Sequence, residues 1–183
     1  YAGTSLESVN KADSSLNMVK KLFINGVGEK TYSIYYDGYK HIPNSLKKIT
    51  ITGGTRIPTD AFNGFKNLTE INLPDTITSI GDNAFEGCGS LSALPNIKNV
   101  KTIGSYAFAN CKSLESVTIP SATDVLGNYA SSNCTSLKSA TISDGVGSIG
   151  VYVFDKCTAI ESITLPYAGT SLESVNKADS SLN

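Results

Sequence analysis

Apolar side chains recur along this chain with a fixed period of 23 residues. A small residue followed by an aromatic one occurs at Ala61-Phe62, and related pairs follow at residues 84–85, 107–108, 130–131 and 153–154. Leucine or isoleucine follows each pair at the same distance, at residues 68, 91, 114, 137 and 160. So many columns in phase predict a solenoid, in which similar coils stack and each contacts only its neighbours.

The first half of one unit, from Leu68 onward, has the pattern of a short β-strand. Ile71 and Leu73 are two residues apart, so they point to the same side of a strand. Pro74 follows directly, and it ends the strand because proline has no N–H to donate to a sheet. The polar residues between these apolar positions are predicted to point to solvent.

The second half of the unit returns the chain to the core. Ile80 is apolar, and Gly81 after it is predicted to form a tight or left-handed turn without a Cβ clash. Ala84, Phe85 and Cys88 are spaced at i, i+1 and i+4. This spacing predicts a short helical turn that points the phenylalanine and the cysteine inward.

Together these units predict a β-rich solenoid of short strands and short helical turns, with about five coils over residues 46–166. One coil cannot bury its own apolar side, but coils stacked about 4.8 Å apart bury a continuous core. The fourth coil departs from the pattern, since Ser131 replaces the phenylalanine and Ala140 replaces the strand aliphatic. Thinner packing is expected there, because a Phe-to-small change in a core typically costs about 3–5 kcal/mol.

The two ends of the chain are identical, since residues 1–17 and residues 167–183 both read YAGTSLESVNKADSSLN. The offset of 166 residues indicates either tandem modules of that length or an artificial repetition of the segment. Because residue 167 follows the last predicted strand, residues 1–45 are interpreted as an insertion between coils, with a β-hairpin over residues 18–40. Residues 167–183 then begin the next such insertion.

The unit from Leu68 to Cys88, LTEINLPDTITSIGDNAFEGC, resembles the repeat of the BspA-like class of leucine-rich-repeat proteins. The resemblance extends over residues 46–166 and rests on a specific motif, approximately L-x-x-L-x-L-P-x-x-L-x-x-I-G-x-x-A-F-x-x-C. It implies a leucine-rich-repeat solenoid from a microbial, typically bacterial, surface or secreted protein that works in adhesion and protein binding. An extracellular or cell-surface location is therefore expected, although no signal peptide or anchor is visible in this chain.

Composition and charge remove several classes of function. The chain has 15 Lys and Arg against 16 Asp and Glu, and it lacks the cationic stripe that nucleic-acid binding requires. No apolar run approaches the roughly 18–20 residues of a membrane span. A single histidine, His41, completes no catalytic triad pattern, and no Cys or His pair has zinc-ligand spacing. We therefore expect neither catalysis nor a metal or other cofactor.

Two columns are predicted to form structural ladders inside the solenoid. The phenylalanine ladder consists of Phe62, Phe85, Phe108 and Phe154, and the cysteine ladder of Cys88, Cys111, Cys134 and Cys157. An even number of cysteines also fits disulfides. Stacked side chains point in parallel, however, which suits a disulfide poorly, and Phe65 occupies the same column in the first coil. Buried free thiols are the favoured interpretation.

The outward positions of the strands form a candidate binding surface for an extended partner. Two columns of side chains are expected to line this concave face. The candidate residues are Glu70, Asn72, Ser116, Thr118, Ser139, Thr141, Ser162 and Thr164, and the same columns include Lys48, Thr50, Ala93 and Pro95. A solvated sheet face built from good strand formers is the alternative interpretation.

A second candidate surface is an aromatic patch within the predicted insertion. It consists of Tyr32, Tyr35, Tyr36 and Tyr39, next to His41. Tyrosine is favoured at contact surfaces because it joins a large rigid area to a polar tip, and packing of these rings onto the first coil is the alternative. Three functions follow as hypotheses: adhesion to a protein or matrix component, carbohydrate binding through this patch, and a structural spacer.

Overall fold

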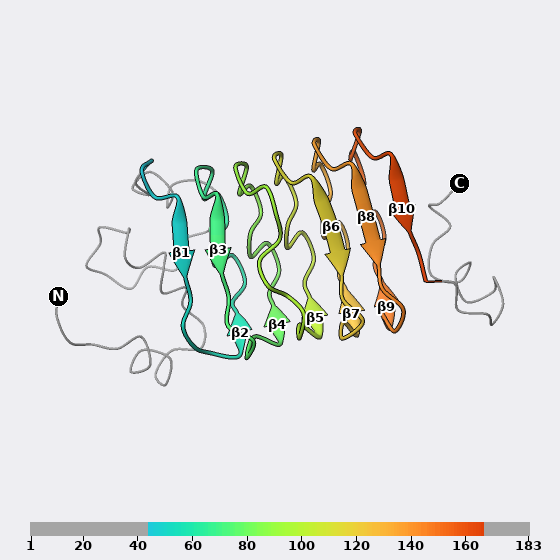
Figure 1. The fold of residues 1–183 in the computed structure, drawn as a ribbon, viewed down its shortest axis with the longest axis horizontal. Coiled ribbons are helices and arrows are strands. Elements are labelled where there is room, and N and C mark those ends of the chain that lie inside the picture. The colour runs from blue at the N-terminus through green and yellow to red at the C-terminus, as the bar shows by residue number, and fades with distance from the viewer. Residues whose placement is uncertain (1–43, 167–183) are drawn as a thin grey trace, which may run out of the picture.

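The computed structural model of the chain describes residues 44–166, which wind into a solenoid with two rows of short strands along its length (Figure 1). The first row contains β1 (Lys48–Thr50), β3 (Glu70–Asn72), β6 (Ser116–Ile119), β8 (Ser139–Ile142) and β10 (Ser162–Thr164). The second row contains β2 (Arg56–Ile57), β4 (Ser79–Ile80), β5 (Thr102–Ile103), β7 (Val125–Leu126) and β9 (Ser148–Ile149).

Each strand pairs in parallel with the equivalent strand of a neighbouring coil, in the register that the repeat predicts. In the first row, Ser116 lies opposite Ser139, which lies opposite Ser162. The five strands of the second row form one continuous sheet. Alternate residues of β3 and β6 point into the core and to solvent. The predicted β-rich solenoid is therefore confirmed.

The first row is interrupted where residues 91–97 form no strand. The sequence predicts Pro95 on the outward face, and this prediction is wrong, because Pro95 is buried. Asn96 stands where other coils have an apolar residue, and its Nδ2 donates to Asp75 Oδ1 at 2.6 Å. Ile97 fills the core instead, with 6% exposure. Since this coil loses the alternation and proline cannot donate, the row divides into the pair β1–β3 and the three-stranded sheet β6–β8–β10.

The segments that carry the Ala-Phe pairs are turns, and residues 44–166 contain no helix, which differs from the predicted helical turns. Backbone N–H groups here donate to the next coil, from Phe62 to the Ala84 carbonyl at 2.7 Å and from Phe85 to the Ala107 carbonyl at 2.8 Å. An N–H used in this way is not available to the carbonyl four residues earlier. Stacking between coils therefore replaces the α-helical hydrogen bonds.

Close packing between coils explains the glycine that follows four of the second-row strands, β4, β5, β7 and β9. Of the tight or left-handed turn predicted at Gly81, the left-handed conformation is absent, since the positive φ angles of glycine occur elsewhere in the described chain. A Cβ at Gly81 would lie 2.5 Å from Thr59 N, and one at Gly104 would lie 2.6 Å from Asp82 N. The backbone of the preceding coil therefore leaves no room for a side chain in this column.

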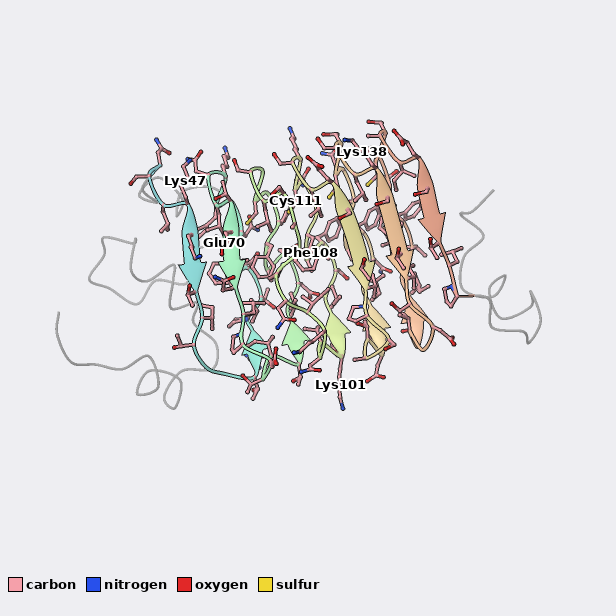
Figure 2. The ribbon with its side chains drawn as sticks, in the orientation of Figure 1. Lys47, Glu70, Lys101, Phe108, Cys111 and Lys138 are labelled. Atoms are coloured by element: carbon pink, nitrogen blue, oxygen red, sulfur yellow. The ribbon has the colours of Figure 1, made fainter. Side chains whose placement is uncertain are left out.

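Phenylalanine rings stack along the solenoid and form the centre of its core. The ring centroids of Phe62 and Phe85 are 5.2 Å apart, as are those of Phe85 and Phe108. Figure 2 shows Phe108 inside the coil stack. Ser131 interrupts the ladder: it is fully buried, and its Oγ has no hydrogen-bond partner among the described residues. Phe154 beyond it is only half-buried, so packing is thinner from this coil onward.

The cysteine ladder consists of four free thiols, of which Cys88, Cys111 and Cys134 are buried and Cys157 is half-buried. The Cys88 thiol donates to the Phe62 carbonyl at 3.1 Å, and the equivalent bond recurs at the other three cysteines. Burial raises the pKa of Cys88 well above its usual value and raises that of Cys111 to about 12. In contrast, a hydrogen bond with the Cys134 thiol lowers the pKa of Cys157.

Candidate binding surfaces

The outward face of β6, β8 and β10 carries two aligned columns of hydroxyl side chains. Strand pairing places three serines in one column and three threonines in the other. The two residues of the middle strand are half-buried between their neighbours, and the outer four are exposed. We call this set the hydroxyl patch, and it consists of Ser116, Thr118, Ser139, Thr141, Ser162 and Thr164. It presents hydrogen-bond donors and acceptors without charge.

The outward face of β1 and β3 is charged instead. Lys48 Nζ lies 2.7 Å from Glu70 Oε1, and Asn72 Nδ2 donates to the same oxygen at 3.0 Å. These hydrogen bonds lower the pKa of Glu70, and the one from Lys48 has the larger effect. The sequence predicts Glu70 and Asn72 on one surface with the hydroxyl side chains. The coil at residues 91–97, which has no first-row strand, separates them from the hydroxyl patch.

Several predicted features lie outside the described residues. They include the β-hairpin over residues 18–40 and the identical segments 1–17 and 167–183. The predicted aromatic patch also lies there, with Tyr32, Tyr35, Tyr36 and Tyr39. These features remain predictions.

A different aromatic feature, which the sequence analysis missed, lies just after the second-row strands β5, β7 and β9. Tyr106, Tyr129 and Tyr152 occupy the same position in three successive coils, and we call them the tyrosine ladder. The rings of Tyr106 and Tyr129 are 4.9 Å apart with planes within 3°. Those of Tyr129 and Tyr152 are 5.0 Å apart with planes within 19°. The 23-residue spacing of the three tyrosines could have revealed the ladder in the sequence.

The backbone of the tyrosine ladder is strained. The φ angles of Tyr106, Tyr129 and Tyr152 are 56°, 55° and 58°, in the left-handed region. This conformation costs a residue with a Cβ about 1–2 kcal/mol, whereas each stacked ring pair contributes about 0.5–1.5 kcal/mol. Two ring pairs therefore offset only part of the strain of three residues. The equivalent residues of the first two coils, Asp60 and Asn83, have φ angles of 56° and 54° but are types that tolerate them.

Polar side chains also line the turns of the first coils. Asn63 Nδ2 lies 3.1 Å from Asp60 Oδ1 and 3.3 Å from Glu86 Oε2, and Asn110 donates to the other Glu86 oxygen. Burial, followed by the negative charge of Asp60, raises the pKa of Glu86. In residues 44–166 no group of three or more side chains is arranged to hold a metal ion. The same range contains no helix that is long and apolar enough to cross a membrane.

Parallel strands in register, one turn of chain per repeat and buried ladders of apolar side chains define the class of leucine-rich-repeat solenoids. The chain belongs to the BspA-type leucine-rich-repeat family, whose repeat matches residues 32–161 in six copies. This match begins inside the range 1–45 that the sequence analysis assigns to an insertion. The match includes all five strands of the second row, from β2 to β9.

Solved structures show the same architecture. A leucine-rich cell surface protein from Faecalibacterium prausnitzii A2-165 is 29% identical, with a TM-score of 0.63, over 74% of this chain and 36% of that chain. This chain therefore spans 36% of the length of that protein. A leucine-rich-repeat protein from T. pallidum is 21% identical, with a TM-score of 0.58, over 68% of this chain and 71% of that chain, and it shows the fold alone. No curated protein matches the chain.

Proposed function

We propose that the chain is a non-enzymatic scaffold, secreted or at the cell surface, that binds an extended protein partner through the hydroxyl patch. The observation that carries this proposal is the alignment of six hydroxyl side chains in two columns across three paired strands. Membership of the BspA-type family supports a scaffold role. The similar F. prausnitzii protein is described as a cell surface protein, which supports the location.

The physical case rests on what the patch offers to a partner. Each hydroxyl can donate and accept a hydrogen bond, so a backbone or polar side chain can bond to it in either sense. The patch carries no charge, so a partner does not lose the hydration of an ion when it docks. The sheet beneath is held by paired backbones, and the bound geometry therefore needs little reorganisation.

Binding of the purified chain to a panel of extracellular matrix proteins tests the proposal. The variant Ser116→Arg/Thr118→Arg places two bulky cations on the exposed hydroxyl patch. Thr102→Arg is the matched control, since Thr102 is an exposed threonine on the second-row strand β5. We expect the patch variant to weaken binding at least about tenfold, as loss of a hot spot does, and the control to bind like the wild type.

Two outcomes contradict the proposal. A patch variant that binds as tightly as the wild type would move the site away from β6, β8 and β10. If no protein in the panel bound, although circular dichroism showed that the proteins were folded, the result would favour the hypothesis of a structural spacer.

A further inference from the structure

The tyrosine ladder exposes large aromatic side chains that the core does not use. Tyr106 and Tyr152 are 38% and 47% exposed. The next residues along the chain from Tyr106 fill the interior, since Ala107 and Phe108 are both fully buried. The rings therefore lie on the outside of a core that is complete without them.

The first coils show that the fold does not require these tyrosines. Asp60 and Asn83 occupy the equivalent positions with equivalent φ angles, and the Phe62–Phe85 stack beneath them is intact. The backbone strain of the three tyrosines is only partly offset by ring stacking, and other coils use residues that tolerate this conformation. Such strain points to a role in binding. A bulky residue with positive φ is a genuine outlier, and here it occurs three times in one column.

The ladder presents polar groups at regular intervals. Within residues 44–166 no hydrogen bond uses the phenol oxygen of Tyr106, Tyr129 or Tyr152, so each is available as a donor and an acceptor to a ligand. The spacing between neighbouring rings is 4.9 and 5.0 Å. A ligand that contacts all three rings equivalently must therefore repeat at close to this distance.

The nearby charges disfavour an anionic ligand. Burial and the neighbouring Tyr106 and Tyr152 raise the pKa of Tyr129, and the carboxylate of Asp155 adds a smaller effect in the same direction. A second carboxylate binds the backbone just before the first ring, since Asp82 Oδ1 accepts the N–H of Ser105 at 2.7 Å. An anionic polymer on the ladder would be repelled by both.

We propose that the tyrosine ladder binds a linear, neutral polysaccharide, with one sugar ring at each coil. Along an extended β-linked chain, hexose rings repeat at close to the ring spacing of the ladder, and their hydroxyls pair with phenol oxygens. An extended polypeptide fits less well, because its residues repeat about every 3.3 Å, which is shorter than the ring spacing of the ladder. This site follows the second strand row, and the hydroxyl patch lies on the first row, so the two proposals stand or fall separately.

Calorimetric titration with neutral β-linked glucose oligosaccharides, from the disaccharide to the hexasaccharide, tests this proposal. We expect the affinity to rise with length until the oligosaccharide spans the ladder and then to level off. Tyr129→Asn removes the middle ring and introduces the residue type that Asn83 provides in an earlier coil, so the variant should fold. We expect it to bind about tenfold more weakly or not at all. Thr135→Asn is the control, since Thr135 is an exposed threonine outside both the tyrosine ladder and the hydroxyl patch, and this variant should bind the oligosaccharides like the wild type.

Each remaining outcome overturns the proposal. Equal affinity of wild type and Tyr129→Asn would show that the sugar binds elsewhere. No binding of any neutral oligosaccharide, or tighter binding of an anionic one, would exclude the ligand class. If Tyr129→Asn instead lost binding to a matrix protein, the ladder would be a protein contact.

Discussion

Replacement of Phe85 by alanine should destabilise the solenoid at its centre. The Phe85 ring is fully buried and stacks on both sides, against Phe62 with planes within 12° and against Phe108 with planes within 1°. The variant Phe85→Ala therefore removes the apolar contacts of one coil with two neighbours. Because each coil in a solenoid is stabilised mainly by its neighbours, both interfaces weaken together.

The expected magnitude follows from burial and stacking. A Phe-to-Ala change in a core costs about 3–5 kcal/mol, and about 0.5–1.5 kcal/mol of stacking per ring pair is included in that loss. We expect a value in the upper part of the range, because Phe85 loses two pairs. Phe154→Ala is the matched control: its ring is half-buried and the serine at position 131 separates it from the stack. The control should lose less, since Phe154 is only partly buried and has no stacked phenylalanine on the side of Ser131.

Urea unfolding followed by far-ultraviolet circular dichroism measures both free energies of unfolding. The slope of the transition also shows whether the variant unfolds in one step or divides into two halves. If Phe154→Ala cost as much as Phe85→Ala, stacking between coils would not be the source of stability and the reasoning would be refuted.

Three further predictions concern packing, thiol reactivity and pH. Gly104→Ala should lower the free energy of unfolding by about 1–3 kcal/mol, because its Cβ would meet the Asp82 backbone. Gly53→Ala, with no atom within 4 Å of the new Cβ, should change it by less than about 0.5 kcal/mol in thermal unfolding, and equal effects would contradict the packing argument. A thiol reagent added to the native protein should label Cys157 first, because it is half-buried and its pKa is lowered, and the other three cysteines only after denaturation. Mass spectrometry of the labelled peptides would disprove this if all four reacted at one rate. Because the folded state raises the pKa of Glu86, the wild type should gain stability relative to Glu86→Gln as the pH falls through that raised pKa. The gain should be complete below the ordinary value of 4.5, and a pH-independent difference in urea unfolding would count against it.

The two proposed sites differ in how they arise from the repeat. The hydroxyl patch needs the strands to pair, since a one-residue slip would turn its serines and threonines into the core. The tyrosine ladder needs only a constant distance between successive coils, since its rings lie in the turns after the second-row strands. A substitution in the coil at residues 91–97 should therefore affect the hydroxyl patch and the tyrosine ladder differently. This coil has no strand in the first row, whereas the second row continues through it.

The coil, its period and its inward-pointing residues are all predictable from the amino-acid sequence. Period-two alternation at positions such as Ile71 and Leu73 decides which side of a strand is buried, and this is a local property of the backbone. The 23-residue period then brings equivalent residues of successive coils together, so the phenylalanine and cysteine ladders and the columns of the hydroxyl patch could be predicted.

Features that depend on contacts between coils could not be predicted in this way. The spacing of Ala84, Phe85 and Cys88 fits a helical turn, but N–H groups in these segments bond to the next coil. The sequence pattern predicts Gly104 as a turn residue. The structure shows instead that the backbone of the neighbouring coil lies too close for a side chain. Pro95 matches an outward position by number, yet the polar residue after it turns this segment and buries the proline. In each case local spacing leaves two conformations possible, and the hydrogen bonds and close contacts made by stacking choose between them.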